Sequence, residues 1–132
     1  MMFVQTIFAE NTLLQQGSTV SIKVNTDRNE TIHNAFFMAF AAAGFKYVND
    51  NSDYMLNVHI TITPVTIPNR PFQYVQLELT ANLIDNNGDL ILPYSISWCD
   101  GHTNLEGAEN RAFREVVKKI HDEYGGMLGG VL

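Results

Sequence analysis

Three long stretches in the middle of the chain alternate apolar and polar side chains. Residues 54–67, 73–85 and 90–100 place an apolar residue at almost every second position. Successive side chains of a β-strand point to opposite faces, so this alternation is typical of strands with one buried and one wet face. The shorter stretch 20–24 follows the same rule. We therefore expect a sheet that is covered on one side only.

Turn residues indicate how these strands are joined. Asn86-Asn87-Gly88-Asp89 separates two of the long strands, and an Asn-Gly pair tolerates the positive φ of a tight hairpin, so these strands should be antiparallel. Pro64 cannot donate a ladder hydrogen bond, so its strand should be an edge there or should bend. Residues 45–48 form a further short strand.

Two segments have the periodicity of amphipathic helices. The first spans residues 30–43 and ends at Gly44, the usual residue at a helix C-terminus. The second starts where Thr103 and Glu106 have capping-box spacing, and its apolar stripe runs to Gly125. Since each helix has one apolar stripe, both should pack on the same sheet face. The fold class is therefore α+β, a two-layer sandwich with two helices on one face of a four- to five-stranded, mostly antiparallel sheet, in the order β-α-β-β-β-β-α.

The length of 132 residues suits one domain. Residues 19–125 contain the α/β sandwich. Residues 1–18 are expected to be an N-terminal arm or an edge strand, although the end of a signal-peptide apolar region is an alternative, with Ala9 before the cleavage point. Residues 126–132 form a glycine-rich apolar tail that either tucks against the sheet edge or links onward.

Composition excludes several classes of function. The net charge is −6, and the eight Lys and Arg residues are scattered rather than clustered, which argues against nucleic-acid binding. No apolar run approaches the roughly 20 residues that cross a bilayer. Cys99 is the only cysteine, so an internal disulfide is impossible.

The best candidate metal ligands are His59, Cys99 and His102. Cys99 and His102 are three residues apart, which places them on opposite faces of a continuous strand unless Gly101 folds the chain back. A structural zinc needs four ligands, usually in close pairs, and these are lacking. Cys99 with His102 is also the only local nucleophile and base pair, with no glycine-rich nucleophile turn before it. We therefore predict no metal, no cofactor and no catalytic residue.

Carboxylates give no paired acid and base. Glu78 on the open face has no acidic neighbour, and the other candidates lie in turns, where Asp is favoured for local hydrogen bonds. The segment Asp85–Asp89 resembles a calcium loop only superficially, because it lacks the later bidentate Glu. We therefore expect a protein that is not an enzyme.

The face of the sheet away from the helices should be polar and mostly uncharged, with Ser21 among its residues. On the first helix, Phe37 and Met38 lie off the buried stripe and require a cover, from either the N-terminal arm or a partner. The candidate interaction residues are Phe37, Met38, His59, Glu78, Cys99 and His102.

Four motifs, in order, resemble a known family. They are AAAGFKYVND, NSDYMLNVHITI, VQLELTANLIDNNGDLIL and WCDGHTNLEGAENRAFREVVKKI. The set resembles the small α/β domains of bacterial envelope lipoproteins: the penicillin-binding-protein activators, the curli-secretion lipoprotein and the N-terminal domain of the Tol-system propeller protein. The likeness covers roughly Thr19 to Tyr124 and includes the step Ser52-Asp53-Tyr54. The lipopolysaccharide-transport lipoprotein that plugs its barrel is similar in its hairpin.

The resemblance implies a non-catalytic accessory or scaffold domain that binds another protein, in the periplasm or at the outer membrane. Self-association is an equally open reading. The lipid-bearing cysteine of those families is lacking near the start of this chain, so lipid anchoring is not carried over. The alternative is a domain that binds a small ligand or a glycan on the polar open face of the sheet.

Overall fold

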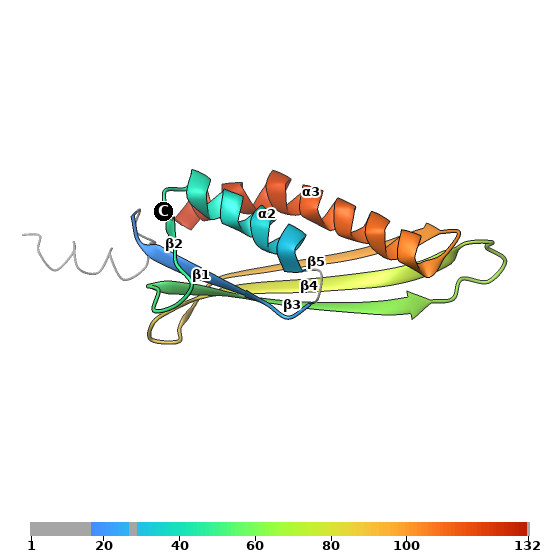
Figure 1. Ribbon diagram of the computed structural model, residues 1–132, viewed down its shortest axis with the longest axis horizontal. Helices are drawn as coiled ribbons and strands as arrows, with labels where there is room; N and C mark the ends of the chain where they lie inside the picture. Colours follow the sequence, from blue (N-terminus) through green and yellow to red (C-terminus); the bar gives the residue numbers. More distant parts are fainter. Residues whose placement is uncertain (1–16, 27–28, 132) are drawn as a thin grey trace, which may run out of the picture.

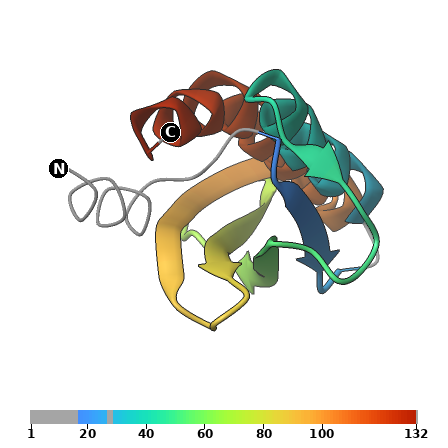
Figure 2. The ribbon, with the colours of Figure 1, turned by 90° about the vertical axis from the view of Figure 1, so that its left-hand side faces the viewer.

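The computed structural model describes residues 17–26 and 29–131, which form two layers (Figures 1 and 2). In chain order the elements are β1 (Thr19–Val24), α2 (Asn29–Ala42), β2 (Lys46–Tyr47), β3 (Tyr54–Val65), β4 (Gln73–Asp85), β5 (Leu90–His102) and α3 (Leu105–Val131). In the described part, both helices lie on one face of a five-stranded sheet. This confirms the predicted α+β sandwich and its order of elements.

The strands lie in the order β2-β1-β3-β4-β5. β1 is parallel to both β2 and β3, whereas the pairs β3–β4 and β4–β5 are antiparallel. β1, β3 and β5 therefore run in the same direction, and α2 and α3 both leave from the same end of the sheet (Figure 1). Residues 1–16, which hold most of the predicted arm and the alternative signal-peptide end, lie outside the described residues.

β3 extends well past its neighbour β1. The pairing of β1 with β3 ends at Val24 opposite Val58, and one further backbone bond joins Asn25 N to the Val58 carbonyl at 3.3 Å. Beyond that point, among the described residues, β3 pairs only with β4. Pro64 lies in this stretch, where its missing N–H removes no ladder bond. The predicted edge position of Pro64 is confirmed.

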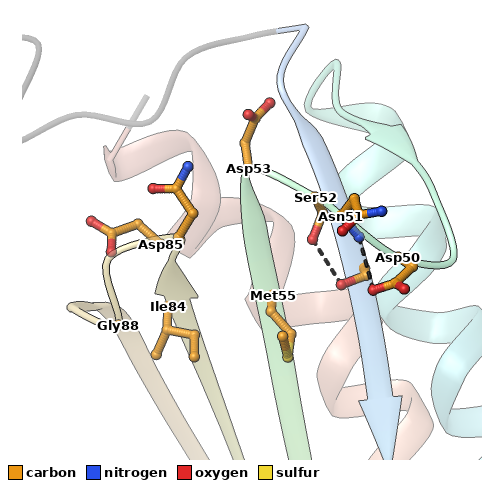
Figure 3. A pocket seen from close by; sticks show the side chains of 10 residues that line it. Asp50, Asn51, Ser52, Asp53, Met55, Ile84, Asp85 and Gly88 are labelled. Atoms are coloured by element: carbon orange, nitrogen blue, oxygen red, sulfur yellow. Dashed lines mark hydrogen bonds between the residues drawn. The ribbon is translucent and has the colours of Figure 1, made fainter.

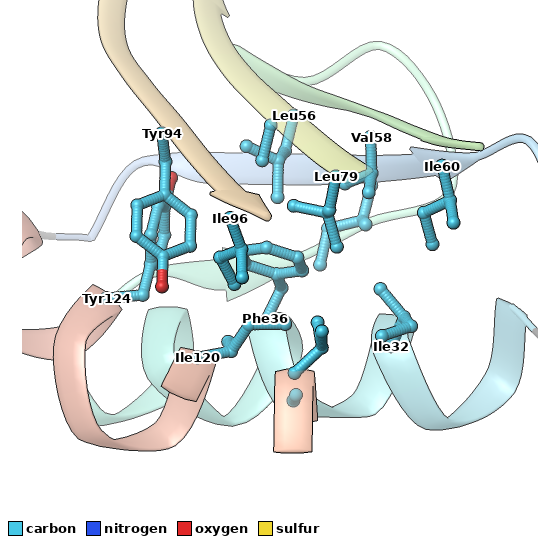
Figure 4. Close-up of a cluster of buried hydrophobic side chains, with 14 of the residues drawn as sticks. Ile32, Phe36, Leu56, Val58, Ile60, Leu79, Tyr94, Ile96, Ile120 and Tyr124 are labelled. Atoms are coloured by element: carbon cyan, nitrogen blue, oxygen red, sulfur yellow. The ribbon is translucent and has the colours of Figure 1, made fainter. Parts of the chain in front are cut away.

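The core lies between the sheet and the helices (Figure 4). Apolar side chains of β3, β4 and β5 face Ile32 and Phe36 of α2 and Ile120 of α3, and these three helix residues are fully buried. Phe36 and Tyr124 pack edge-on with ring centroids 4.9 Å apart. Each large apolar side chain buried in this way stabilises the fold by about 1.5–3 kcal/mol. The alternation in the strands and the helical stripes therefore predicted the core correctly.

Both ends of α3 differ from the prediction. Asn104, rather than Thr103, caps its N-terminus, because Asn104 Oδ1 accepts a hydrogen bond from Gly107 N at 2.7 Å. The helix continues past Gly125 to Val131, although an interior glycine costs about 1 kcal/mol relative to alanine. Leu128 is fully buried against the core, which offsets that cost. The predicted tail, residues 126–132, is therefore helical as far as Val131.

Candidate functional surfaces

The sheet face opposite the helices, here called the open face, carries the polar residues of the alternating strands. Thr61 lies opposite Glu78, and Glu78 lies opposite Ser97. Half-open hollows of ≈ 360, ≈ 330 and ≈ 300 Å³ are lined by the described residues of this face. The two smaller hollows adjoin each other at His59 and Thr80, which line both, and together they extend over β1, β3, β4 and β5.

Ser21 lies on the open face but is only 2 % exposed, so the expectation of a solvated Ser21 was wrong. β2 and β3 lie on either side of β1, so the connection 48–53 has to cross β1 (Figure 3). It crosses at Ser21, which contacts Ser52 of this connection. Ser21 Oγ lies 2.8 Å from Ser52 Oγ, and Ser52 donates to the Tyr54 carbonyl at 2.6 Å. The crossing loop buries this part of the face.

The carboxylates around the hollow of ≈ 360 Å³ serve the turns that surround it (Figure 3). Asp53 Oδ2 accepts from Thr19 N at 2.9 Å, and Asp50 Oδ1 accepts the next backbone N–H at 2.9 Å. Asp85 Oδ1 accepts two backbone N–H groups of the hairpin turn, at 2.9 and 3.0 Å. No group of three or more His, Cys, Asp or Glu that could hold a metal ion occurs among the described residues. This hollow is therefore a structural feature of the loops.

His59, in the middle of the open face, is oriented by Asn25. Ile60 N donates to Asn25 Oδ1 at 2.7 Å, which fixes which end of the side-chain amide faces the strand. Asn25 Nδ2 then lies 2.9 Å from His59 Nδ1, and an amide nitrogen can only donate. His59 Nδ1 is therefore the acceptor, and the ring carries its proton on Nε2. The sequence analysis did not single out Asn25. The only feature of the sequence that could have indicated it is its position directly after a short strand.

The three candidate metal ligands do not converge. His59 lies opposite Thr80 of β4, and Cys99 lies opposite Gln76 of β4. Thr80 and Gln76 are four residues apart in this strand. At about 3.3 Å per residue, these positions are about 13 Å apart. β5 continues to His102, so Gly101 does not fold the chain back. Cys99 therefore lies on the open face and His102 on the helix side, as the odd separation predicted.

Asp100 links β5 to α3. Its carboxylate accepts from Arg111 Nε at 3.1 Å, from Trp98 Nε1 at 3.2 Å and from Gly101 N at 2.9 Å. Burial alone would raise the pKa of Asp100, but these three donors outweigh it and hold the pKa below its ordinary value. Lys119 Nζ lies over the Trp98 ring, 5.2 Å from its centroid. The cluster fastens the helix to the sheet.

Two buried tyrosines lie between α3 and β5. Tyr94 Oη donates to Glu123 Oε1 at 2.8 Å. Burial, together with that carboxylate, raises the pKa of Tyr94. Burial and the nearby Tyr94 raise the pKa of Tyr124, whose hydroxyl has no hydrogen-bond partner among the described residues. Both phenols are thus held neutral inside the core.

The outer surfaces of the two helices differ in chemistry. The solvent face of α3 is strongly charged, and its exposed charged residues are Glu106, Arg111, Arg114, Lys118, Asp122 and Glu123. α2 has no charged residue after Glu30. Its exposed apolar residues form what we call the α2 patch, consisting of Phe37, Met38, Ala41 and Ala42. Phe37 is 39 % and Met38 57 % exposed. Helical periodicity also places Ala41 off the predicted buried stripe, whereas Ala42 was not singled out from the sequence, although the long run without charge indicates it.

Comparison with solved structures identifies similar folds in bacterial lipoproteins. A minor lipoprotein of Acinetobacter baumannii matches with a TM-score of 0.58 and 14 % identity, over 83 % of this chain and 93 % of that one. A lipoprotein of Caulobacter crescentus matches with a TM-score of 0.58 and 14 % identity, over 84 % of this chain and 90 % of that one. A Xanthomonas campestris protein of the DUF330 family matches with a TM-score of 0.59 and 10 % identity, over 86 % of this chain and 85 % of that one. The chain therefore has a lipoprotein-type fold.

No protein-family model and no curated protein matches the sequence. The specific lipoprotein families named from the motifs therefore remain a resemblance, while the broader lipoprotein-type fold is confirmed. None of the helices in the described part is both long and apolar enough to span a membrane.

Proposed function

We propose that this chain is a non-catalytic accessory domain of the bacterial cell envelope, and that it binds another protein through the α2 patch. The observation that carries the proposal is the contrast between the neighbouring helices: α3 presents charges to solvent, whereas α2 presents Phe37 and Met38. Interface cores are depleted of charged residues and enriched in aromatic residues and Met.

The energetics favour a covered patch. Full burial of a Met side chain stabilises by about 1.5–3 kcal/mol, and covering Met38 would gain the fraction of this free energy that corresponds to its exposed part. Phe37 would contribute less, because its ring already packs on Tyr47, with ring centroids 5.6 Å apart. This contact also holds Phe37 in place before binding, which lowers the entropic cost of association. The border of the patch is polar, since His33 Nε2 lies 3.2 Å from Tyr47 Oη.

The compartment is inferred from fold likeness. The similar structures from Acinetobacter and Caulobacter are described as lipoproteins, which supports an envelope location for this chain. The roles of two side chains with shifted pKa values support a protein without catalytic turnover. Asp100 and Tyr94 both hydrogen bond to side chains of α3 and so join this helix to β5. Catalytic sites instead gather several perturbed groups in one cleft.

Affinity capture from envelope fractions tests this proposal. The full chain serves as bait in three forms: unchanged, Met38→Glu, and Leu90→Glu as the matched control. Leu90 is 55 % exposed, close to the 57 % of Met38, but lies at the hairpin. We expect one envelope protein, or a second copy of this chain, to be retained by the unchanged chain and by Leu90→Glu and lost with Met38→Glu. Equal retention by all three, or a purely cytosolic chain, would contradict the proposal.

A further inference from the structure

The two smaller hollows of the open face, here together called the polar depression, adjoin each other at His59 and Thr80. Together they contain one ammonium group, on Lys23, and one carboxylate, on Glu78. The remaining polar lining is hydroxyl, amide and imidazole. Its members are Asn25, Asn57, His59, Thr61, Thr80, Asn82, Ser95 and Ser97. Hydroxyls both donate and accept hydrogen bonds, so this lining suits an uncharged ligand that is itself rich in hydroxyls.

His59 supplies a preset donor within this depression. The Asn25 amide is held by Ile60 N and occupies His59 Nδ1, as described above. His59 Nε2–H has no partner among the described residues and remains available on the open face. A donor whose ring orientation is fixed in advance loses little entropy when a ligand binds.

Glu78 supplies the matching acceptor. It makes no hydrogen bond or ion pair with the described residues, and it is exposed. Because His59 lies opposite Thr80, Glu78 is its diagonal neighbour on the next strand. Such diagonal positions are about 7–8 Å apart, which leaves room for a ligand group between donor and acceptor. A carboxylate can accept two adjacent hydroxyls at once.

An aromatic pair lies farther along the same face. The Tyr74 ring covers Gly101, where a Cβ atom would come within 2.5 Å of the ring. Phe72 is 49 % exposed, and its ring centroid lies 6.4 Å from that of Tyr74. Tyr74 precedes Glu78 by four residues, about 13 Å along β4. Flat apolar surface beside a row of hydroxyl, amide and carboxylate groups matches a sugar ring, which has C–H faces and hydroxyl edges.

We propose that the open face binds an uncharged oligosaccharide. Its hydroxyls bond to His59 Nε2–H, Glu78 and the Ser and Thr side chains, and a further sugar unit packs on Tyr74 and Phe72. The length of the face favours a chain of several sugars over a single unit. This site is on the opposite side of the sheet from the α2 patch, so either proposal can fail without the other.

Titration of the ¹⁵N-labelled full chain with cellohexaose, maltohexaose and chitohexaose, followed by NMR, tests the inference. We expect at least one of them to shift the amides of β3, β4 and β5 on the open face in a saturable way. Glu78→Gln and His59→Ala should each raise Kd by about tenfold, as loss of a hydrogen bond to a well-placed group does. His121→Ala, exposed on α3, is the matched control and should leave Kd unchanged. Circular dichroism establishes that each variant is folded.

Three results would overturn the inference. The first is that none of the three hexasaccharides shifts any open-face amide at millimolar concentration. The second is that shifts occur but Glu78→Gln and His59→Ala bind as well as the unchanged chain. The third is that hyaluronan, a polyanion, binds more tightly than every neutral sugar, since the depression is argued to select an uncharged ligand.

Discussion

Asp53 and Thr19 hydrogen bond to each other in both directions. Asp53 Oδ2 accepts from Thr19 N at 2.9 Å and from Thr19 Oγ1 at 3.1 Å, and Asp53 N donates to Thr19 Oγ1 at 2.8 Å. The pair closes the loop that crosses β1, in which Ser52 contacts Ser21. It thereby joins the start of β1 to the residue that precedes β3.

Asp53→Ala should lower the free energy of unfolding by about 1 kcal/mol, because the side-chain bonds are lost at an exposed site. The matched control is Asp50→Ala in the same loop, whose carboxylate accepts only the next backbone N–H and should matter less. Urea unfolding followed by circular dichroism measures both. Equal losses in the two variants would show that the bonds to Thr19 have no special weight.

Tyr124→Phe should leave stability unchanged or raise it by up to about 1 kcal/mol, because it removes a buried hydroxyl without a partner among the described residues. Tyr94→Phe should instead lose about 0.5–1.5 kcal/mol, since its hydroxyl bonds to Glu123. Thermal unfolding of the two variants makes the comparison. A clear loss in Tyr124→Phe would mean that this hydroxyl has a partner beyond the described residues.

The stabilisation from Asp100 should depend on pH. Donors from Arg111, Trp98 and Gly101 outweigh burial and hold the pKa of the folded state below the unfolded value of about 3.9. The contribution is therefore complete above about pH 5 and is lost as pH falls below 4 through the folded pKa. The stability difference between the unchanged chain and Asp100→Asn should shrink across that range. A constant difference from pH 6 to pH 2.5 would contradict this account.

Gly101→Ala should destabilise the sheet edge, because the new Cβ would come within 2.5 Å of the Tyr74 ring. The same substitution in a Tyr74→Ala background should cost much less, so the two effects should not add. A double-mutant cycle by chemical denaturation measures the coupling between these positions. Additive effects would show that the ring moves aside at no cost.

The alternation in the strands was sufficient to predict the core, because a period of two leaves a strand only one way to bury its apolar residues. Pro64 likewise predicted a sheet edge from its missing N–H. The course of the β2–β3 connection was not predictable, since the local pattern at Ser21 does not reveal a loop that crosses from another part of the chain.

Glycine propensity led to the wrong end for α3. Gly125 and Gly126 indicate a helix end by local rules, but Leu128 continues the buried stripe, and packing against the core determines the outcome. On the surfaces, Phe37, Met38, His59 and Glu78 were singled out from sequence. The fixed orientation of His59 depends on Asn25, 34 residues earlier, and such a contact only becomes visible in the folded chain.

The central claim is that the α2 patch contacts a protein partner in the cell envelope. Photo-crosslinking in living source cells tests it most directly, with benzoylphenylalanine placed at Met38, or at Leu90 as the comparison position. We predict one discrete cross-linked species in the envelope fraction from position 38 and none from position 90. No species from position 38, or the same species from both positions, would contradict the claim.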